Sequence, residues 1–320
     1  VGALKPVETF PTLKTVSVDE IVQICRDKQV GLVDVAQDNA VEAGLVDRLQ
    51  QEGVTTVGPT RTAGEIEWNK VWAREFGQRH ELPQPHFKIC LSQDEGIQFL
   101  NSQPDQPWFV KASGLAEGKG ALPAKNKQEA VERVREISRF GKAGKVFLIE
   151  KWLQSSDGTP AEEFSTYVFS DGENYKLVGS AQDHKRVYNN DNGENTGGMG
   201  CSTPPLVLTP ELMKEVEKKI LVKTLKGLSF EGRLYKGVLY LGGIIVGSEP
   251  YVVEFNARWG DPEAQVVLPG IKTPMSDIAF ACINGNLNEI KIEEDDVTRV
   301  CVVGASRGYP GNYDAVRGKR

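Results

Sequence analysis

The chain has few cysteines and no pattern that would pair them. Its five cysteines are odd in number and widely spaced, and they form no CxxC pair. This argues against both a disulfide framework and a zinc site, so we expect buried thiols in a reducing compartment. The cysteines are Cys25, Cys90, Cys201, Cys282 and Cys301.

Two further features are missing, and each excludes a class of protein. No apolar run reaches transmembrane length and no charged-then-apolar leader opens the chain, so we expect a cytoplasmic protein without a membrane partner. The 38 basic residues are outnumbered by 44 acidic ones, and the net charge of −6 argues against nonspecific nucleic-acid binding. The 39% hydrophobic and 26% charged residues over 320 positions fit a globular protein of two or three domains.

The beginning of the chain alternates between helix-like and strand-like segments. Residues 18–25 repeat apolar side chains at helical spacing, and Ser17 has the position of a capping-box residue. Residues 31–36 and 54–57 are short apolar runs of strand length, and a helix is expected between them over 41–51. Such alternation predicts a parallel sheet.

The rest of the chain predicts an α+β architecture, so the fold class is α/β followed by α+β. We expect helices over 62–80, 126–140 and 209–228, strands over 108–111 and 146–150, a hairpin of 163–169 with 175–180, and a strand pair of 234–246 with 251–255.

A glycine-rich stretch, 114–120, directly follows the strand that ends at Lys111. Closely spaced glycines let backbone N–H groups approach phosphate oxygens, while Lys111 and Lys119 supply positive charge. The stretch is not a Walker A loop, because Lys119 is followed by Gly120 and not by Ser or Thr. Taken alone, the motif is equally compatible with phosphate binding and with a surface turn.

A second motif lies at the end of the last expected strand, at residues 254–263. Glu254 and Asn256 are two residues apart and therefore face the same side of the strand. A carboxylate and an amide oxygen suit Mg²⁺, which takes few protein ligands and shares the rest with phosphates and water. Arg258 continues on that face and can bind a phosphate or carboxylate through two N–H groups. We favour a metal site over a solvated strand end.

The third group of motifs gives a weaker signal. Residues 182–186 form a polar cluster of mixed charge, and the glycine-rich loop 195–200 follows it. Both are suited to an anionic substrate, but without further context a solvated strand end and a flexible loop explain them better. His184 has no nucleophile nearby in the sequence, so it is given at most a positioning role. Residues 150–153 could present backbone groups to an adenine ring or form an interdomain linker.

Taken together, these segments resemble the ATP-grasp enzymes, specifically the glycinamide ribonucleotide synthetase (phosphoribosylamine–glycine ligase) family. The resemblance implies an ATP-grasp domain over 106–292, with a small lobe over 106–153 and a large lobe over 161–292. A partial N-terminal α/β substrate domain over 1–60 and a connecting helix and linker over 61–105 would precede it, and the start of a C-terminal domain over 293–320 would follow. The matching segments are 58–60, 110–120, 181–186, 195–200, 237–240 and 254–265.

The resemblance also implies a role for each matched residue. Catalytic roles fall to Asp183, Lys185 and Arg258, and Mg²⁺ or Mn²⁺ would be bound by Glu254 and Asn256. ATP would be bound by Lys70, Lys111, Gly118, Lys119, Gly120, Glu150, Lys151, Trp152, Leu153 and Glu163. The other substrates would contact Asn195, Thr196, Gly197, Gly198, Asp261 and Pro262.

The implied reaction joins glycine to 5-phosphoribosylamine through glycyl phosphate, giving glycinamide ribonucleotide, ADP and phosphate in de novo purine biosynthesis. The implied partners are these small molecules and ATP, with no nucleic acid and no membrane, bound by a monomer or homodimer. Two alternatives stay open: another ATP-grasp carboxylate–amine ligase, and a catalytically weak ATP-binding module.

The chain departs from the family pattern at several positions. By this resemblance we expect it to begin after the family's glycine-rich strand–turn–helix, and residues 37–40 stand where the family has a loop with proline and glutamate. Ser113 replaces an expected Asp, and Glu117 replaces a small residue. Pro123 is expected to interrupt a strand, and residues 155–160 have the form of an insertion.

Overall fold

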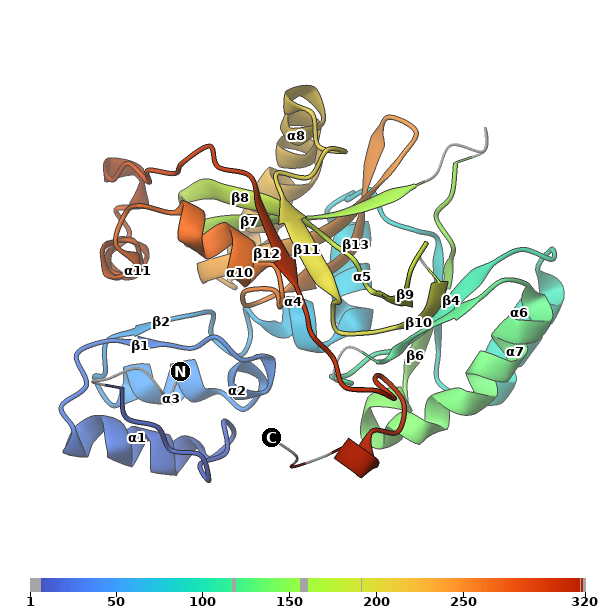
Figure 1. Cartoon of the computed structure of the whole chain (residues 1–320), viewed down its shortest axis with the longest axis horizontal. Coiled ribbons are helices and arrows are strands. Elements are labelled where there is room, and N and C mark those ends of the chain that lie inside the picture. Colours follow the sequence, from blue (N-terminus) through green and yellow to red (C-terminus); the bar gives the residue numbers. More distant parts are fainter. Residues whose placement is uncertain (1–6, 117–118, 156–160, 191, 317, 319–320) are drawn as a thin grey trace.

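The computed structural model describes residues 7–116, 119–155, 161–190, 192–316 and 318. A small N-terminal unit lies on one side of a large central sheet, and a lobe with its own sheet lies on the other side (Figure 1). Gly118, one of the expected ATP contacts, lies outside the described residues, as do Glu117 and most of the expected insertion.

The N-terminal unit contains the parallel pair predicted from the sequence. Strands β1 (Val33–Asp34) and β2 (Thr56–Val57) run parallel, and α1 (Val18–Asp27), α2 (Asp38–Glu42) and α3 (Leu45–Gln51) surround them. Apolar side chains from these elements form a separate core cluster. The pair is short, because each strand has only two residues.

Two local predictions in this unit are wrong. The helix expected over 41–51 is broken at Gly44, which adopts the left-handed φ of +79° that favours glycine and separates α2 from α3. Ser17 stands at the beginning of α1, but its side chain makes no capping hydrogen bond.

The long helix expected over 62–80 is also two helices. The helices α4 (Glu65–Trp68) and α5 (Lys70–Arg79) are separated by Asn69, which has φ −129° and ψ 89°. The side chain of Asn69 accepts a hydrogen bond from Trp72 N at 3.1 Å and so caps α5. As a consequence, Lys70 is the first residue of a helix.

The small lobe is a four-stranded antiparallel sheet in the order β3-β6-β4-β5, covered by two helices and a 3₁₀ segment. The expected break at Pro123 is wrong: β5 is an edge strand, where a residue without an N–H is tolerated. The elements are β3 (Phe87–Cys90), α6 (Gln93–Ser102), β4 (Trp108–Ala112), β5 (Ala121–Ala124), α7 (Lys127–Glu136), the 3₁₀ segment Ile137–Gly144 and β6 (Phe147–Lys151).

The large lobe is a six-stranded sheet in the order β13-β12-β7-β8-β11-β14, and apolar clusters cover both of its faces. The hairpin and the strand pair predicted from the sequence are confirmed. The strands are β7 (Glu162–Asp171), β8 (Tyr175–Asp183), β11 (Gly200–Thr203), β12 (Lys236–Val246), β13 (Glu249–Asn256) and β14 (Arg299–Val302), and β9 (Arg186–Tyr188) pairs with β10 (Asn192–Asn195) in a separate hairpin. The helices are α8 (Pro210–Val216), a π segment Glu217–Leu221, α9 (Val222–Phe230), α10 (Ala264–Val267) and α11 (Met275–Asn284).

Four of the five cysteines are buried, as expected, but Cys301 on β14 is only partly buried, because β14 lies at the edge of its sheet. Among the described residues, no helix is long and apolar enough to cross a membrane.

Candidate functional site

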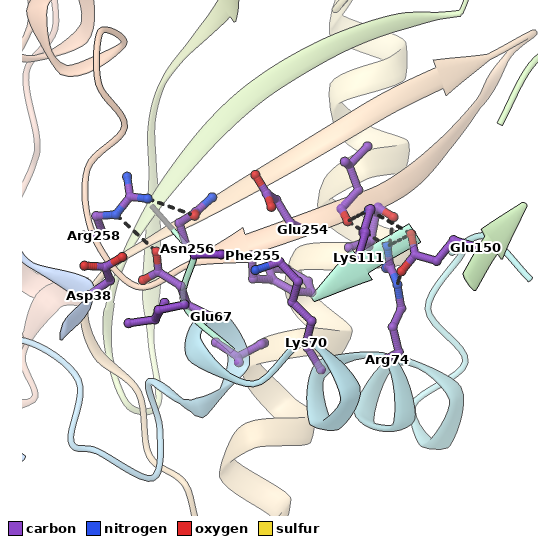
Figure 2. A pocket seen from close by; sticks show the side chains of 16 residues that line it. Asp38, Glu67, Lys70, Arg74, Lys111, Glu150, Glu254, Phe255, Asn256 and Arg258 are labelled. Carbon is purple, nitrogen blue, oxygen red and sulfur yellow. Dashed lines mark hydrogen bonds and ion pairs between the residues drawn. The ribbon is translucent and has the colours of Figure 1, made fainter. Parts of the chain in front are cut away.

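A pocket lined by many charged side chains lies where the small lobe, α5 and β13 meet (Figure 2). Lys70 is contributed by the first turn of α5, Lys111 by β4 and Glu150 by β6, while Glu254 and Asn256 come from the end of β13. The structure therefore brings together residues that lie almost 190 positions apart.

One end of the pocket is held by a buried group of three charges. Arg74 donates from Nε and Nη2 to the two carboxylate oxygens of Glu150 at 2.6 and 3.0 Å, and Lys111 Nζ lies 2.8 Å from Glu150 Oε2. Arg74 also donates to the carbonyl oxygens of Val252 and Val253 on β13. Although burial raises the pKa of Glu150, the positive charges of Arg74 and Lys111 outweigh it and lower that pKa to about 2.

Glu254 and Asn256 lie side by side on the pocket face of β13, as the strand periodicity predicts (Figure 2). Burial alone would raise the pKa of Glu254, but Lys185, Lys70 and Lys111 lower it below its ordinary value, so the carboxylate is ionised. No cluster of three or more metal-ligating His, Cys, Asp or Glu side chains occurs among the described residues. One carboxylate and one amide fit a magnesium-type ion that takes its other ligands from phosphates and water.

Arg258 occupies the opposite end of the pocket from Arg74 (Figure 2). Its guanidinium Nε lies 3.1 Å from Glu67 Oε1, and Nη2 donates to Asn256 Oδ1 at 3.3 Å. Burial raises the pKa of Glu67 to about 7, although Arg258 and the bond from the Ala257 N–H act in the opposite direction.

Asp183 and Lys185 lie beside this pocket at the end of β8. Lys185 Nζ is 3.1 Å from Glu163 Oε2, and the carboxylates of Glu163, Glu254 and Asp183 raise the pKa of Lys185 even though burial lowers it. Burial raises the pKa of Asp183 to about 7. Its Oδ1 is buried and has no hydrogen-bond partner among the described residues. The Oδ1 atom of Asp183 can therefore still accept a hydrogen bond, and charged side chains of both signs lie nearby.

The glycine-rich loop after β10 packs directly on this end of the site. Thr196 Oγ1 donates to the Lys185 carbonyl at 2.8 Å and accepts from the Gly198 N–H at 3.0 Å. Gly198 has φ +136°, and a Cβ there would lie 2.3 Å from Pro262 and 3.0 Å from Asp183 Oδ1. Only glycine permits this close approach. The structure thus brings together three motifs that are separate in the sequence.

Hydrogen bonds to Glu263 connect the turn after Arg258 to the large sheet. This buried carboxylate accepts from Tyr240 Oη at 2.6 Å and from Ser165 Oγ at 2.9 Å. A Cβ at Gly260 would lie 2.4 Å from Glu263 Oε2, so glycine is required for the turn to pack closely. Asp261 is exposed and accepts from Gln265 Nε2 at 2.8 Å.

The remaining expected ATP contacts lie outside the lining of this pocket. The indole of Trp152 packs against Phe109 with ring centroids 4.5 Å apart, and the backbone N–H of Trp152 donates to the Pro107 carbonyl. Lys151 is exposed and Leu153 is partly buried, just beyond β6. Two further members of this group are Lys119, which is exposed, and Gly120, which is buried. Asn195 is exposed at the end of β10, and Gly197 N donates to Tyr309 Oη at 3.4 Å.

Sequence reasoning missed Glu67 and Arg74, which contact pocket residues from α4 and α5. With Lys70 they occur at positions 67, 70 and 74, the spacing of one helix face. This signal was available in the sequence, but charged residues at that spacing are usually solvated. Only their burial, at 5% exposure each, distinguishes them from a surface face.

Comparisons with known proteins agree with the motifs. The model of the phosphoribosylglycinamide synthetase N domain matches residues 3–67, and that of the ATP-grasp (A) domain of the same family matches residues 68–264. The phosphoribosylamine–glycine ligase of Chlorobaculum tepidum is 39% identical over 94% of this chain and 70% of that protein. The trifunctional purine biosynthetic protein adenosine-3 of Gallus gallus is 39% identical over 92% of this chain, which spans only 29% of that protein.

Solved structures share the fold. The phosphoribosylamine–glycine ligase of Thermotoga maritima matches with a TM-score of 0.70 and 29% identity, over 83% of this chain and 66% of that one. The biotin carboxylase domain of Hydrogenobacter thermophilus 2-oxoglutarate carboxylase, solved with MgADP, matches with a TM-score of 0.66 and 16% identity, over 89% of this chain and 61% of that one. The resemblance stated from the motifs is confirmed: the chain belongs to the phosphoribosylamine–glycine ligase family and contains its N domain followed by its ATP-grasp domain.

Proposed function

We propose that this chain ligates glycine to 5-phosphoribosylamine with ATP, through glycyl phosphate, and releases glycinamide ribonucleotide, ADP and phosphate. The observation that carries the proposal is the shared pocket: two lysines suited to phosphates and a carboxylate–amide pair suited to Mg²⁺ lie beside an arginine suited to an anion. The chain spans 70% of the bacterial ligases that it matches, so the activity of the whole protein is part of the proposal.

ATP would lie along the end of the pocket that is formed by Lys70 and Lys111. Glu254 and Asn256 would hold Mg²⁺ or Mn²⁺, which when bound neutralises phosphate charge. Residues 150–153, Glu163 and 118–120 would surround the nucleotide. Both oxygens of Glu150 already bond Arg74 and Lys111, so its contribution would be to hold the Lys111 ammonium toward the phosphates.

Glycine and the phosphoribosyl group would lie toward Arg258 and Asp183. Lys185 and Arg258 would steady the carboxylate of glycine while it attacks the γ-phosphate, and the loop 195–198 would close over the acyl phosphate with residues 261–262. The amine of phosphoribosylamine then displaces phosphate. Catalysis would come from positioning and charge neutralisation, with no covalent intermediate on the enzyme.

The same reasoning extends to the organisation of the chain. We propose an N-terminal substrate unit over 1–60, a connecting segment over 61–105, the ATP-grasp unit over 106–292 and the start of a further domain over 293–320. The N-terminal unit reaches the pocket through Asp38, at the beginning of α2 (Figure 2). The proposed assembly is a monomer or homodimer.

An assay of ADP release tests the proposed function. We expect release to require both glycine and 5-phosphoribosylamine, with glycinamide ribonucleotide formed in equal amount. Release with glycine alone and no product would point to a damaged second site. Release driven by another carboxylate would favour a different ATP-grasp ligase, and nucleotide binding without release would favour a binding module.

Replacing Asp183 by asparagine is expected to stabilise the free protein while lowering its activity. Because burial raises the pKa of Asp183 to about 7 from its ordinary 3.8, the folded state binds this proton more tightly than the unfolded state. The contribution of the carboxyl to stability therefore falls as the pH rises from about 4 to 7. At pH 8 the variant should melt about 2–4 °C higher. This is the shift that about 1 kcal/mol produces in a domain of the size of the proposed ATP-grasp unit, 106–292.

The pH dependence provides the control for this prediction. At pH 5 the Asp183 carboxyl is already largely protonated in the folded protein, so the difference in Tm between Asp183→Asn and the parent should shrink. Calorimetry at both pH values measures it. A variant that melts lower than the parent at pH 8 would contradict the prediction.

A further inference from the structure

The short helix α4 carries two glutamates that each pair with an arginine, but only one pair lies in the pocket. Glu67 is 5% exposed, accepts from the Ala257 N–H at 2.8 Å through Oε2, and lies 3.1 Å from Arg258 Nε through Oε1. Glu65 Oε2 instead lies 2.7 Å from Arg233 Nη1, away from the pocket lining. Glu67 thus links α4 to the end of β13, the strand that carries the two proposed metal ligands, Glu254 and Asn256.

The guanidinium of Arg258 is fixed on three sides by the protein. Nε faces Glu67, Nη2 donates to Asn256 Oδ1 at 3.3 Å, and Nη1 donates to the Trp259 carbonyl at 3.0 Å. A guanidinium has five N–H groups, so one N–H on each Nη atom stays available. A pair of N–H groups of this kind binds two oxygens of one carboxylate or phosphate.

The charge of Glu67 also matters for Arg258. Burial lowers the pKa of Arg258, but the carboxylates of Glu67, Asp38 and Glu254 raise it above its ordinary value. Of these three, only Glu67 is within ion-pair distance of the guanidinium, as Figure 2 shows. Asp38 and Glu254 make no ion pair with Arg258.

We propose that Glu67 is a positioning residue, which holds the Arg258 guanidinium so that its two remaining N–H groups face the substrate anion. The inference rests on the proposed function for the identity of that anion, the glycine carboxylate or the phosphate transferred from ATP. Without Glu67, rotation about the Arg258 side chain moves those N–H groups away from the anion. A misplacement of about 1 Å is enough to cost on the order of 100-fold in rate.

The first test compares Glu67→Gln with Glu65→Gln, since each change replaces a carboxyl group of α4 that faces an arginine from another part of the chain by an amide. We expect Glu67→Gln to lower kcat of glycine-dependent ADP release by roughly 10- to 100-fold while the KM for ATP changes less than about twofold. Glu65→Gln should keep the parent kcat. Equal kcat in both variants would overturn the inference.

A second measurement distinguishes positioning from a general structural effect. In an Arg258→Gln background, Glu67→Gln should cost no further activity, because there is no guanidinium left to orient. The same fold-loss in both backgrounds would show that Glu67 acts independently of Arg258 and would overturn the proposal.

A binding experiment keeps the test independent of turnover. The Kd for inorganic phosphate in the presence of MgADP, measured by calorimetry, should rise at least about fivefold in Glu67→Gln and stay unchanged in Glu65→Gln. If the parent releases no ADP but this difference is found, the proposed ligation fails and the positioning role stands. An unchanged phosphate Kd in Glu67→Gln would overturn the positioning role.

Discussion

Replacing Glu254 by glutamine is expected to lower kcat/KM for ATP-dependent ligation by roughly 100- to 1000-fold, because neutralising phosphate charge accounts for several kcal/mol of catalysis. The change keeps the size of the side chain but removes the ionised carboxylate from the two proposed metal ligands, Glu254 and Asn256. Positive charges hold the pKa of Glu254 below its ordinary value, so the parent carboxylate is charged at neutral pH. A coupled ADP assay over a range of Mg²⁺ concentrations measures the loss.

His184→Ala is the control for this experiment. The side chain of His184 is exposed, and the contacts that its backbone makes, to Gly200 and Met199, survive the substitution. We expect kcat/KM within about threefold of the parent, the range usual for replacing an exposed side chain, although Asp183 and Lys185 are its neighbours in the sequence. An inactive His184→Ala together with an active Glu254→Gln would refute the assignment of these two residues.

The second large effect concerns stability. Replacing Glu150 by glutamine should lower the free energy of unfolding by about 3–5 kcal/mol, because it leaves Arg74 and Lys111 buried without their shared carboxylate. Glu150 is 2% exposed, so water cannot take the place of its carboxylate. Urea unfolding followed by fluorescence measures the change.

The acid dependence of stability gives an independent check on Glu150. Its pKa is about 2 in the folded protein, against an ordinary value of 4.5, so the folded state binds this proton less tightly than the unfolded state. The stabilisation is present in full above about pH 4.5 and is lost as the pH falls through about 2. Stability should therefore fall less steeply with acid in Glu150→Gln than in the parent.

A more exposed ion pair, made by Arg79 near the end of the helix α5 that also carries Arg74, supplies the comparison. Arg79 on α5 pairs through two bonds with Glu231, but the Arg79 side chain is 44% exposed. Glu231→Gln should therefore cost only about 0–1 kcal/mol. Equal losses in the free energy of unfolding for Glu150→Gln and Glu231→Gln would show that burial does not determine how much the group of Glu150, Arg74 and Lys111 stabilises the protein.

Several features of this protein follow from local sequence. The paired strands β12 and β13 could be predicted because continuous apolar runs bounded by glycine and charged residues are typical of strands. The period of two along β13 places Glu254 and Asn256 on one side, which the structure confirms. The order of the motifs along the chain was enough to recognise the family.

Other features depend on contacts that no local pattern contains. Asn69 ends α4 because its side chain caps α5 and accepts from Ser113 on the small lobe, 44 residues away. Glu150 was assigned from the sequence to a nucleotide contact, but its carboxylate is shared by Arg74 and Lys111 from two other elements.

The sequence by itself determined the family, the strand that carries the proposed metal pair and the residues that face one side of it. Only the tertiary structure decided which charges pair: Glu67 with Arg258, and Glu150 with Arg74 and Lys111. The physical reason is that hydrophobic periodicity is a local property of the chain. The partner of a buried charge is set by which elements the fold brings within a few ångströms.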